Sequence, residues 1–269
     1  MAGSTQIRNS EQVNLLRADF QPRYEPNFAW KSAVSALLAL PGLRAAWSMS
    51  SVDYAAATQA RDVSGGAYHL TNNNTATFGY WANSLIPCVT FDGVNQNLTR
   101  ADGGAGNWAD IIGTEAYIAA GQRGLTLGCW VNAASFVALL PFIFDKLNAY
   151  YIYFGGAGNN QPAFQLFDTI GGFPVVTSTT VCTATAWYFV CGRFTPGTMD
   201  IYVNDSLTSA AAAGSVAIVD SAGQFTIGSS GAPGNYFSGS MSLCFLCAAS
   251  LSDSIIKAFY QQTRAMYGV

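Results

Sequence analysis

The chain has 269 residues, of which 50% are hydrophobic and only 10% are charged, and its formal net charge at pH 7 is −3. A chain of this length can bury a large core, and all-β sandwiches of this size often form one domain. The few lysines are scattered and no apolar run is long enough to span a bilayer, so we expect neither nucleic acid nor a membrane as a partner.

The low charge has two explanations, which both stay open. Either the surface is polar but uncharged, or partner subunits cover much of it. The N-terminus has no hydrophobic region typical of a signal peptide, so we expect synthesis in a cytoplasm without export. In that compartment the six cysteines are expected to be buried free thiols rather than disulfides.

Residues 1–29 are polar and contain two prolines. They are either a disordered tail or an extended arm that docks on a neighbouring subunit. A solvated tail seldom holds several aromatic residues, so we favour the anchoring arm and predict one domain over residues 30–269. The aromatic residues that would anchor it are Phe20, Tyr24, Phe28 and Trp30.

The next segment, residues 30–40, has helical spacing of apolar residues and ends before Pro41 and Gly42, which predicts a short helix. Residues 101–124 are irregular and are predicted to be a long loop. Short strands are predicted at residues 43–49, 68–70, 86–92, 96–100, 125–131, 139–146, 150–154, 163–167, 173–181, 187–194, 199–204, 215–219, 224–227 and 237–248.

Residues 187–204 predict a β-hairpin around the turn Thr195-Pro196-Gly197-Thr198. Its first strand is apolar on both faces, as expected of a strand that is covered twice. Strict alternation along residues 237–248 places Phe237, Met241, Leu243, Phe245 and Cys247 on one face.

The last segment, residues 252–267, predicts a helix that Ser252 caps and that buries Ile255, Ile256, Phe259 and Tyr260. Many short strands between two helices indicate an all-β fold. We therefore predict an antiparallel two-sheet sandwich with a short N-terminal helix and a C-terminal helix.

Several short motifs follow one another in a known order. They are Leu43 to Trp47 (L-x-x-x-W), Arg61 to Leu70 (D-x-S-G), Val89 to Val94 (F-D-G), Leu125 to Val131, Trp187 to Asn204, and Phe237 to Tyr260. Together they resemble the laminin-G-like, concanavalin A-like lectin and glucanase jelly rolls over residues 43–262. The resemblance implies a jelly-roll sandwich that binds sugars with aromatic rings and amides in its surface loops.

Two departures bear on a metal site. The hairpin ends in Val203-Asn204-Asp205 where the family usually has V-D-G, and Ser242 stands where many members have an acidic residue. Members that bind calcium use carboxylates near such places, so no metal and no cofactor are expected. The arm, the segment around Pro41 and Gly42 and the 101–124 insert also resemble virion proteins of tailed bacteriophages.

The sequence lacks the catalytic residues that glucanases and serine hydrolases need. The glucanase branch uses two glutamates on one strand, whereas Glu11 and Glu25 fall in the arm and Glu115 in the irregular loop. The chain has a single histidine, His69, and no G-x-S-x-G motif, so a serine hydrolase is not expected either. We predict that the protein is not an enzyme.

Binding remains. Trp81, Trp108, Tyr236 and Asn159 lie in Gly- and Asn-rich segments and are the candidate carbohydrate-binding residues. The alternative is that these side chains cap the sandwich or contact a neighbouring subunit. The favoured function is a structural protein of a phage particle, in the head, tail or decoration, that contacts other virion proteins and copies of itself. A glycan-binding adhesion module that recognises host carbohydrate is the alternative.

Overall fold

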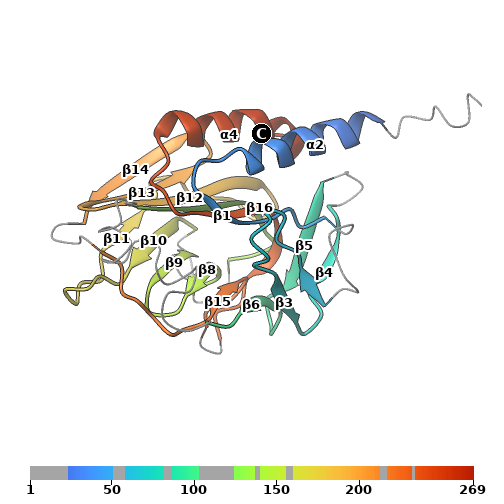
Figure 1. The fold of residues 1–269 in the computed structure, drawn as a ribbon. Helices are drawn as coiled ribbons and strands as arrows, with labels where there is room; N and C mark the ends of the chain where they lie inside the picture. The colour runs from blue at the N-terminus through green and yellow to red at the C-terminus, as the bar shows by residue number, and fades with distance from the viewer. Residues whose placement is uncertain are drawn as a thin grey trace, which may run out of the picture.

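Two antiparallel sheets lie face to face, and two helices cover the outer side of one of them (Figure 1). This confirms the predicted jelly-roll sandwich with one helix near each end of the chain. The computed structural model describes residues 24–50, 58–81, 86–102, 124–136, 140–155, 160–212, 217–231 and 234–269, with residues 24–28 and 211 described by their backbone alone.

The first sheet, sheet A, lies beneath the helices in Figure 1. Its strands, in spatial order, are β14 (Ser206–Ala211), β13 (Thr198–Val203), β12 (Trp187–Thr195), β7 (Leu125–Ala133), β16 (Ser238–Cys247), β5 (Pro87–Asp92) and β4 (Thr77–Tyr80), and β1 (Leu43–Trp47) also pairs with β16.

The second sheet, sheet B, forms the layer farther from the helices. Its strands, in spatial order, are β11 (Val175–Thr177), β10 (Pro162–Leu166), β9 (Tyr150–Phe154), β8 (Phe142–Lys146), β15 (Phe225–Ile227), β6 (Asn97–Arg100), β3 (Leu70–Asn73) and β2 (Gln59–Ala60).

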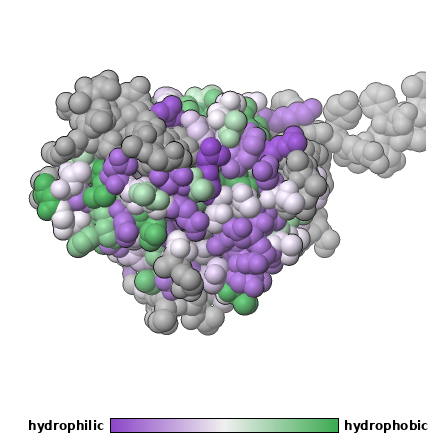
Figure 2. Space-filling model, turned by 60° about the horizontal axis from the view of Figure 1, so that its bottom comes forward, coloured by the Kyte–Doolittle hydropathy of each residue, from purple (hydrophilic) through white to green (hydrophobic). Residues whose placement is uncertain are grey.

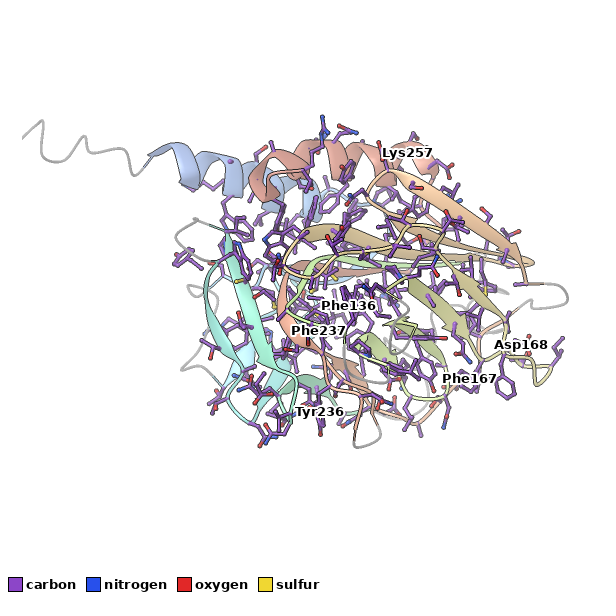
Figure 3. All side chains as sticks on the ribbon, turned by 180° about the vertical axis from the view of Figure 1, so that it is seen from behind. Phe136, Phe167, Asp168, Tyr236, Phe237 and Lys257 are labelled. Carbon is purple, nitrogen blue, oxygen red and sulfur yellow. The ribbon has the colours of Figure 1, made fainter. Side chains whose placement is uncertain are left out.

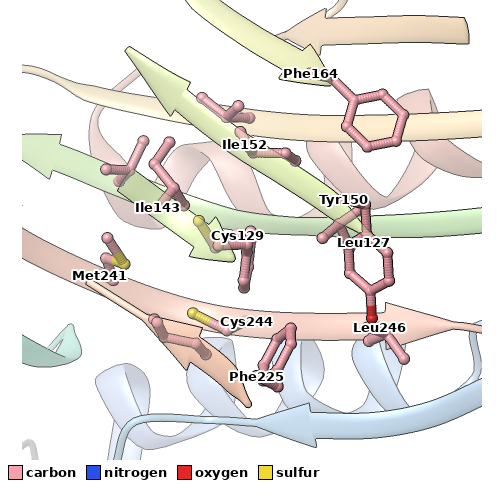
Figure 4. Packing of buried hydrophobic residues seen from close by; sticks show 14 of the residues in the cluster. Leu127, Cys129, Ile143, Tyr150, Ile152, Phe164, Phe225, Met241, Cys244 and Leu246 are labelled. Atoms are coloured by element: carbon pink, nitrogen blue, oxygen red, sulfur yellow. The ribbon is translucent and has the colours of Figure 1, made fainter. Parts of the chain in front are cut away.

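The main core fills the space between the two sheets. Figure 4 shows Leu127, Cys129 and Cys244 from sheet A facing Tyr150 and Phe225 from sheet B. All five side chains are buried. A close-packed interior of this kind holds the two sheets in one fixed arrangement.

A second apolar cluster lies between sheet A and the helices α2 (Tyr24–Leu38) and α4 (Asp253–Tyr267). Trp130 of β7 stacks on Tyr267 with 4.1 Å between the ring centroids, and its indole N–H donates to Thr263 Oγ1 at 3.0 Å. The helix ends at Gly268, whose φ of 74° suits a residue without a side chain. These contacts fix α4 on sheet A.

Strand β12 shows why the hairpin pattern was apolar on both faces. Val190 and Phe194 belong to the core between the sheets, whereas Phe189 and Cys191 belong to the cluster under the helices. The double covering predicted from the sequence is confirmed. Cys244 and Cys247 of β16 likewise fall in different clusters, and all six cysteines are free and buried, as expected.

The same hairpin carries an ion pair that connects α4 to sheet A. The Arg193 guanidinium donates to Asp200 Oδ2 at 2.7 Å, to the Leu251 carbonyl at 2.8 Å and to Asp253 Oδ1 at 2.6 Å. The Tyr202 hydroxyl also donates to Asp253. Asp200 is therefore a structural carboxylate that holds Arg193, and Arg193 contacts the start of the helix.

The single face predicted for residues 237–248 is wrong. Leu243 has a φ of 47°, and the register between β16 and β7 shifts by one residue between Ser242 and Phe245. Such a bulge places two successive side chains on one face and reverses the alternation beyond it. Phe237 and Met241 therefore point between the sheets, whereas Leu243, Phe245 and Cys247 point toward the helices.

Other elements also differ from the prediction, and strands β2 and β4 were not predicted. Helix α2 begins at Tyr24, so residues 24–29 of the expected extended arm are helical. The strand β14 was not predicted: Asn204 adopts a φ of 58° and makes a tight turn although the usual V-D-G is absent. Of the predicted strand 215–219, Ile218 forms only an isolated bridge with Asp168, and residues 213–216 lie outside the described residues.

None of the helices described here is long and apolar enough to cross a membrane.

Candidate functional site

The two sheets differ in how their outer faces are covered. Helices α2 and α4 lie over sheet A, while no helix of the described ranges lies over sheet B (Figure 1). Figure 2 looks toward this second face and shows hydrophobic side chains gathered on the side of β10 and β11. Four large apolar residues there are 40–66% exposed: Ile170, Phe173, Val175 and Val181.

A row of five aromatic rings crosses the outer face of β8, β9 and β10. Tyr153 stacks on Phe142, with 5.4 Å between the ring centroids, and Phe142 meets Tyr151 edge to face at the same distance. Tyr151 then meets Phe167 at 5.1 Å, and Phe167 meets Phe173 at 4.9 Å. We call these five rings the aromatic face. Edge-to-face and stacked pairs of this kind hold one another in place.

Strand alternation produces the aromatic face. In β9, Tyr150, Ile152 and Phe154 point into the core, so Tyr151 and Tyr153 point outward. The β10 residue Gln165 lies opposite Tyr151. The face is therefore built on rigid strands, except for Phe167 and Phe173, which lie on either side of the turn between β10 and β11.

Polar groups border the rings. The Tyr153 hydroxyl donates to Gln165 Oε1 at 3.4 Å, and the Asn148 backbone N–H donates to the Tyr151 hydroxyl at 3.1 Å. Partial burial raises the pKa of both tyrosines, so both hydroxyls stay protonated at neutral pH. The surface thus combines flat apolar rings with neutral donors and acceptors.

A buried carboxyl group lies beside the aromatic face. Asp145 of β8 is opposite Tyr151 and Thr226 in the strand register, and it is 1% exposed. Its Oδ2 accepts from the Gly231 backbone N–H, whereas its Oδ1 has no hydrogen-bond partner. Burial raises the pKa of Asp145 to about 7, against the lowering effects of that N–H and of Lys146.

The comparisons with known proteins fit this architecture. The family model described as the concanavalin A-like lectin/glucanases superfamily matches residues 102–256, more than half of the chain. The chain belongs to this superfamily. A search of curated protein sequences finds no match.

Solved structures with a similar fold are binding domains of bacterial toxins. The binding domain of Paraclostridial Mosquitocidal Protein 1 has a TM-score of 0.60 at 9% identity over 83% of this chain. The binding domain of Botulinum Neurotoxin DC, solved with SialylT, has a TM-score of 0.57 at 12% identity over 84% of the chain. The binding domain of Botulinum Neurotoxin serotype G has a TM-score of 0.57 at 12% identity over 81% of the chain.

These likenesses concern the fold alone. The chain spans about half the length of the toxin binding domains it matches, 52%, 52% and 50% of the three. A shared jelly roll does not carry a ligand from one protein to another, because binding depends on the side chains at the site. The aromatic face of this member of the superfamily therefore has to be judged from its own residues.

The residues predicted to bind carbohydrate do not form one site. Trp81 packs edge-on against Trp187 in the layer under the helices, with 5.6 Å between centroids. Tyr236 lies before β16, and Figure 3 shows it apart from Phe167 and Asp168. The carbonyl of its neighbour Asn235 accepts from the Phe142 backbone N–H at 3.4 Å, so this segment borders the Phe142 end of the aromatic face. Trp108 and Asn159 lie outside the described residues.

The predicted anchoring residues are described in part. Phe20 lies outside the described residues, and Tyr24 and Phe28 lie on the helical backbone of α2. Trp30 packs against the apolar cluster between α2 and sheet A. Docking of residues 1–29 on another subunit stays a prediction.

The glycosidase branch of the superfamily needs two carboxylates on one strand. Among the strands described, β5, β8 and β13 hold one carboxylate each, and the others hold none. Asp200 and Asp253 do approach each other, but Arg193 holds both. The hydrogen bond from Tyr202, followed by that from Arg193, lowers the pKa of Asp253, which is the opposite of what a general acid needs. No group of three His, Cys, Asp or Glu residues suited to a metal occurs in the part of the chain searched.

The sequence prediction missed the aromatic face. The run Tyr150-Tyr151-Ile152-Tyr153-Phe154 was identified as a strand but not as a site. Its signal was available: a strand that is aromatic on both faces must either be covered twice or expose a row of rings. Sequence alone did not say which, because the positions of the helices depend on the whole fold.

Proposed function

We propose that this protein is a non-enzymatic, carbohydrate-binding member of the superfamily and that the aromatic face is its sugar-binding surface. The observation that carries the proposal is the row of five contacting rings on the outer face of sheet B, over which none of the described helices lies. One face of a pyranose ring presents C–H groups that pack against an aromatic ring, while hydroxyl groups surround it. The aromatic rings can pack against the C–H face of the sugar, and the amide and hydroxyl groups beside the rings can hydrogen-bond its hydroxyl groups.

The exposure of the face supports a binding role. Within it Phe173 is 61% exposed, Tyr151, Tyr153 and Phe167 are half-buried and Phe142 is buried, and Ile170 in the adjoining turn is 66% exposed. Exposed apolar groups beside partly exposed rings are typical of a place where a ligand or partner binds. Gln165, beside Tyr153, supplies the directional hydrogen bonds that a purely apolar patch would lack.

The test is binding of the purified protein to a glycan array, followed by titration of the best glycan with two variants. Phe173→Ala removes an exposed ring, and we expect binding at least about tenfold weaker, corresponding to 1.4 kcal/mol. Tyr80→Ala is the matched control, because Tyr80 is 53% exposed on β4 of the other sheet, and it should bind like the parent. Absence of glycan binding, or equal loss in both variants, would contradict the proposal.

A role as a structural protein of a bacteriophage particle is the second candidate. The observation in its favour is a long N-terminal segment that enters helix α2, which packs on sheet A with α4, in a chain with few charges. Such a segment can link a binding domain to neighbouring copies or to other virion proteins. Terminase, portal and capsid genes beside this one would support it, and normal incorporation of a chain lacking residues 1–29 into particles would refute the anchoring arm.

A further inference from the structure

The strands at the ends of the two sheets differ in length. In the described part of the chain, β14 and β4 end the strand order of sheet A, and β11 and β2 end that of sheet B. Strand β4 has four residues, β11 has three and β2 has two, whereas β14 has six. Proteins often keep edge strands very short, because the unpaired backbone groups of a longer edge can pair with another chain. Strand β14 is therefore the edge best able to accept a further strand.

The register shows which backbone groups of β14 point away from the sheet. In an antiparallel pair, successive residues direct their N–H and C=O alternately toward the partner strand and away from it. The Ala212 N–H donates to the Gly197 carbonyl at 3.0 Å, in the same register that pairs β13 with β14. The even-numbered residues of β14 therefore bond to β13, and Leu207, Ser209 and Ala211 direct their backbone groups outward. No bond to these outward groups occurs among the residues that the structure describes.

Strand β14 carries none of the devices that usually protect an edge. Its sequence, SLTSAA, contains no charged residue and no proline, and its register with β13 has no bulge. Charged side chains, prolines and bulges are the features that keep the edges of natural sheets from pairing with one another. The side chains of β14 thus leave its outward backbone accessible to a second strand.

Apolar surface lies beside this edge. Strands β11 and β14 contact each other and lie at the same side of the sandwich (Figure 1). The Thr179 N–H donates to Thr208 Oγ1 at 3.2 Å, and Val181 in the same segment is 61% exposed. Because this bond uses the Thr208 side chain, it leaves the outward backbone groups of β14 unused. A partner that pairs with β14 would lie close to exposed apolar surface that it could cover.

We propose that β14 pairs antiparallel with β14 of a second copy of this chain, about a two-fold axis at Ser209. The axis places Leu207 opposite Ala211 of the partner subunit, so each outward N–H of one strand faces an outward C=O of the other. The surface is self-complementary, which makes a second copy the partner that fits it. Asp205, in the turn before β14, lies beyond the paired stretch, so like charges do not meet.

This interface lies apart from the sugar-binding proposal and does not depend on it. The two copies would join their A sheets into one continuous sheet, whereas the aromatic face lies on the outer side of sheet B. Edge pairing of this kind gains its affinity from main-chain hydrogen bonds. Its signature is therefore the protection of particular backbone amides.

The experiment measures backbone amide exchange of the full chain by NMR at low and high protein concentration, with sedimentation velocity to follow association. We expect a monomer–dimer equilibrium. The Leu207 and Ser209 amides should exchange at least about tenfold more slowly in the dimer, because only there are they hydrogen-bonded. The Thr208 and Ala210 amides, which bond to β13, should be protected at both concentrations.

Two variants at one position separate the backbone from the side chain. Ser209→Pro removes the outward N–H, and edge strands tolerate proline where the N–H faces away from the sheet. We expect its dimer to be at least about tenfold weaker. Ser209→Ala is the matched control: it also removes the hydroxyl that donates to Asp200, but it keeps the N–H, so it should dimerise like the parent.

Four results would overturn the inference. They are a chain that stays monomeric at all concentrations, a dimer in which the Leu207 and Ser209 amides exchange as fast as in the monomer, a dimer that survives in folded Ser209→Pro, and slow exchange of both amides already in the monomer. The last result would mean that another segment of the same chain covers the edge. If Ser209→Pro does not fold, the exchange measurement on the parent still decides.

Discussion

The buried carboxyl group of Asp145 makes the stability of the fold depend on pH in a direction that can be measured. Burial raises its pKa from 3.8 to about 7. Folding therefore favours the protonated acid, so the stabilisation is complete below pH 4 and is lost as the pH rises toward 7 and above. The gap of about three pH units, at 1.36 kcal/mol each, corresponds to roughly 4 kcal/mol.

Asp145→Asn removes the ionisation and can keep the hydrogen bond from Gly231. We expect the variant and the parent to be similarly stable near pH 4. At pH 8 the variant should be more stable, by up to roughly 4 kcal/mol. Urea unfolding followed by tryptophan fluorescence at pH 4, 6 and 8 measures the difference.

Asp92→Asn is the matched control, because the pKa of Asp92 is shifted in the opposite direction and its effect on stability depends on pH with the opposite sign. Slight burial raises the pKa of this exposed carboxyl, but hydrogen bonds from the Val94 and Asn95 backbone outweigh that effect and lower it. The stabilisation that the ionised Asp92 carboxylate gives the fold should be present above pH 4 and lost as the pH falls below it. If the advantage of Asp145→Asn does not grow between pH 4 and pH 8, the account of this buried acid is wrong.

Three further predictions concern the fold. Arg193→Met should lower the free energy of unfolding by about 3 kcal/mol, because it leaves Asp200 buried and unpaired; a loss no larger than that of Lys257→Met on the surface of α4 would contradict this. Gly192→Ala should destabilise the protein by about 1–3 kcal/mol in urea unfolding, since the new Cβ would lie 2.9 Å from the Phe164 ring, and an unchanged midpoint would refute it. Native protein should react with a thiol reagent only as fast as it unfolds, because all six cysteines are buried, so rapid labelling under native conditions would count against the packing.

Most of the fold could be predicted because its signals are local. The hairpin over residues 187–204 has a strong turn and a pattern that identifies both of its faces, and the structure places those faces in two different clusters. The free cysteines and the C-terminal helix followed from composition and periodicity. What failed was the alternation beyond Ser242, because a bulge depends on the pairing of β16 with β7 and leaves no mark in a single sequence.

The candidate site was harder to predict than the fold. Trp81 was chosen because it is an aromatic residue in a loop-like segment, yet its ring packs on Trp187, a core residue of the predicted hairpin. The aromatic face was overlooked because it lies on strands, where aromatic residues usually mean core. Only the positions of α2 and α4 decide that β9 is covered on one face and β12 on both.

Direct measurement of glycan binding by the parent protein and by Phe173→Ala tests the central claim most sharply. The account predicts that the parent binds at least one glycan, that Phe173→Ala binds it at least about tenfold more weakly, and that Tyr80→Ala binds it equally well. Equal binding by the parent and Phe173→Ala, with both proteins folded, would show that the aromatic face is not the sugar-binding surface.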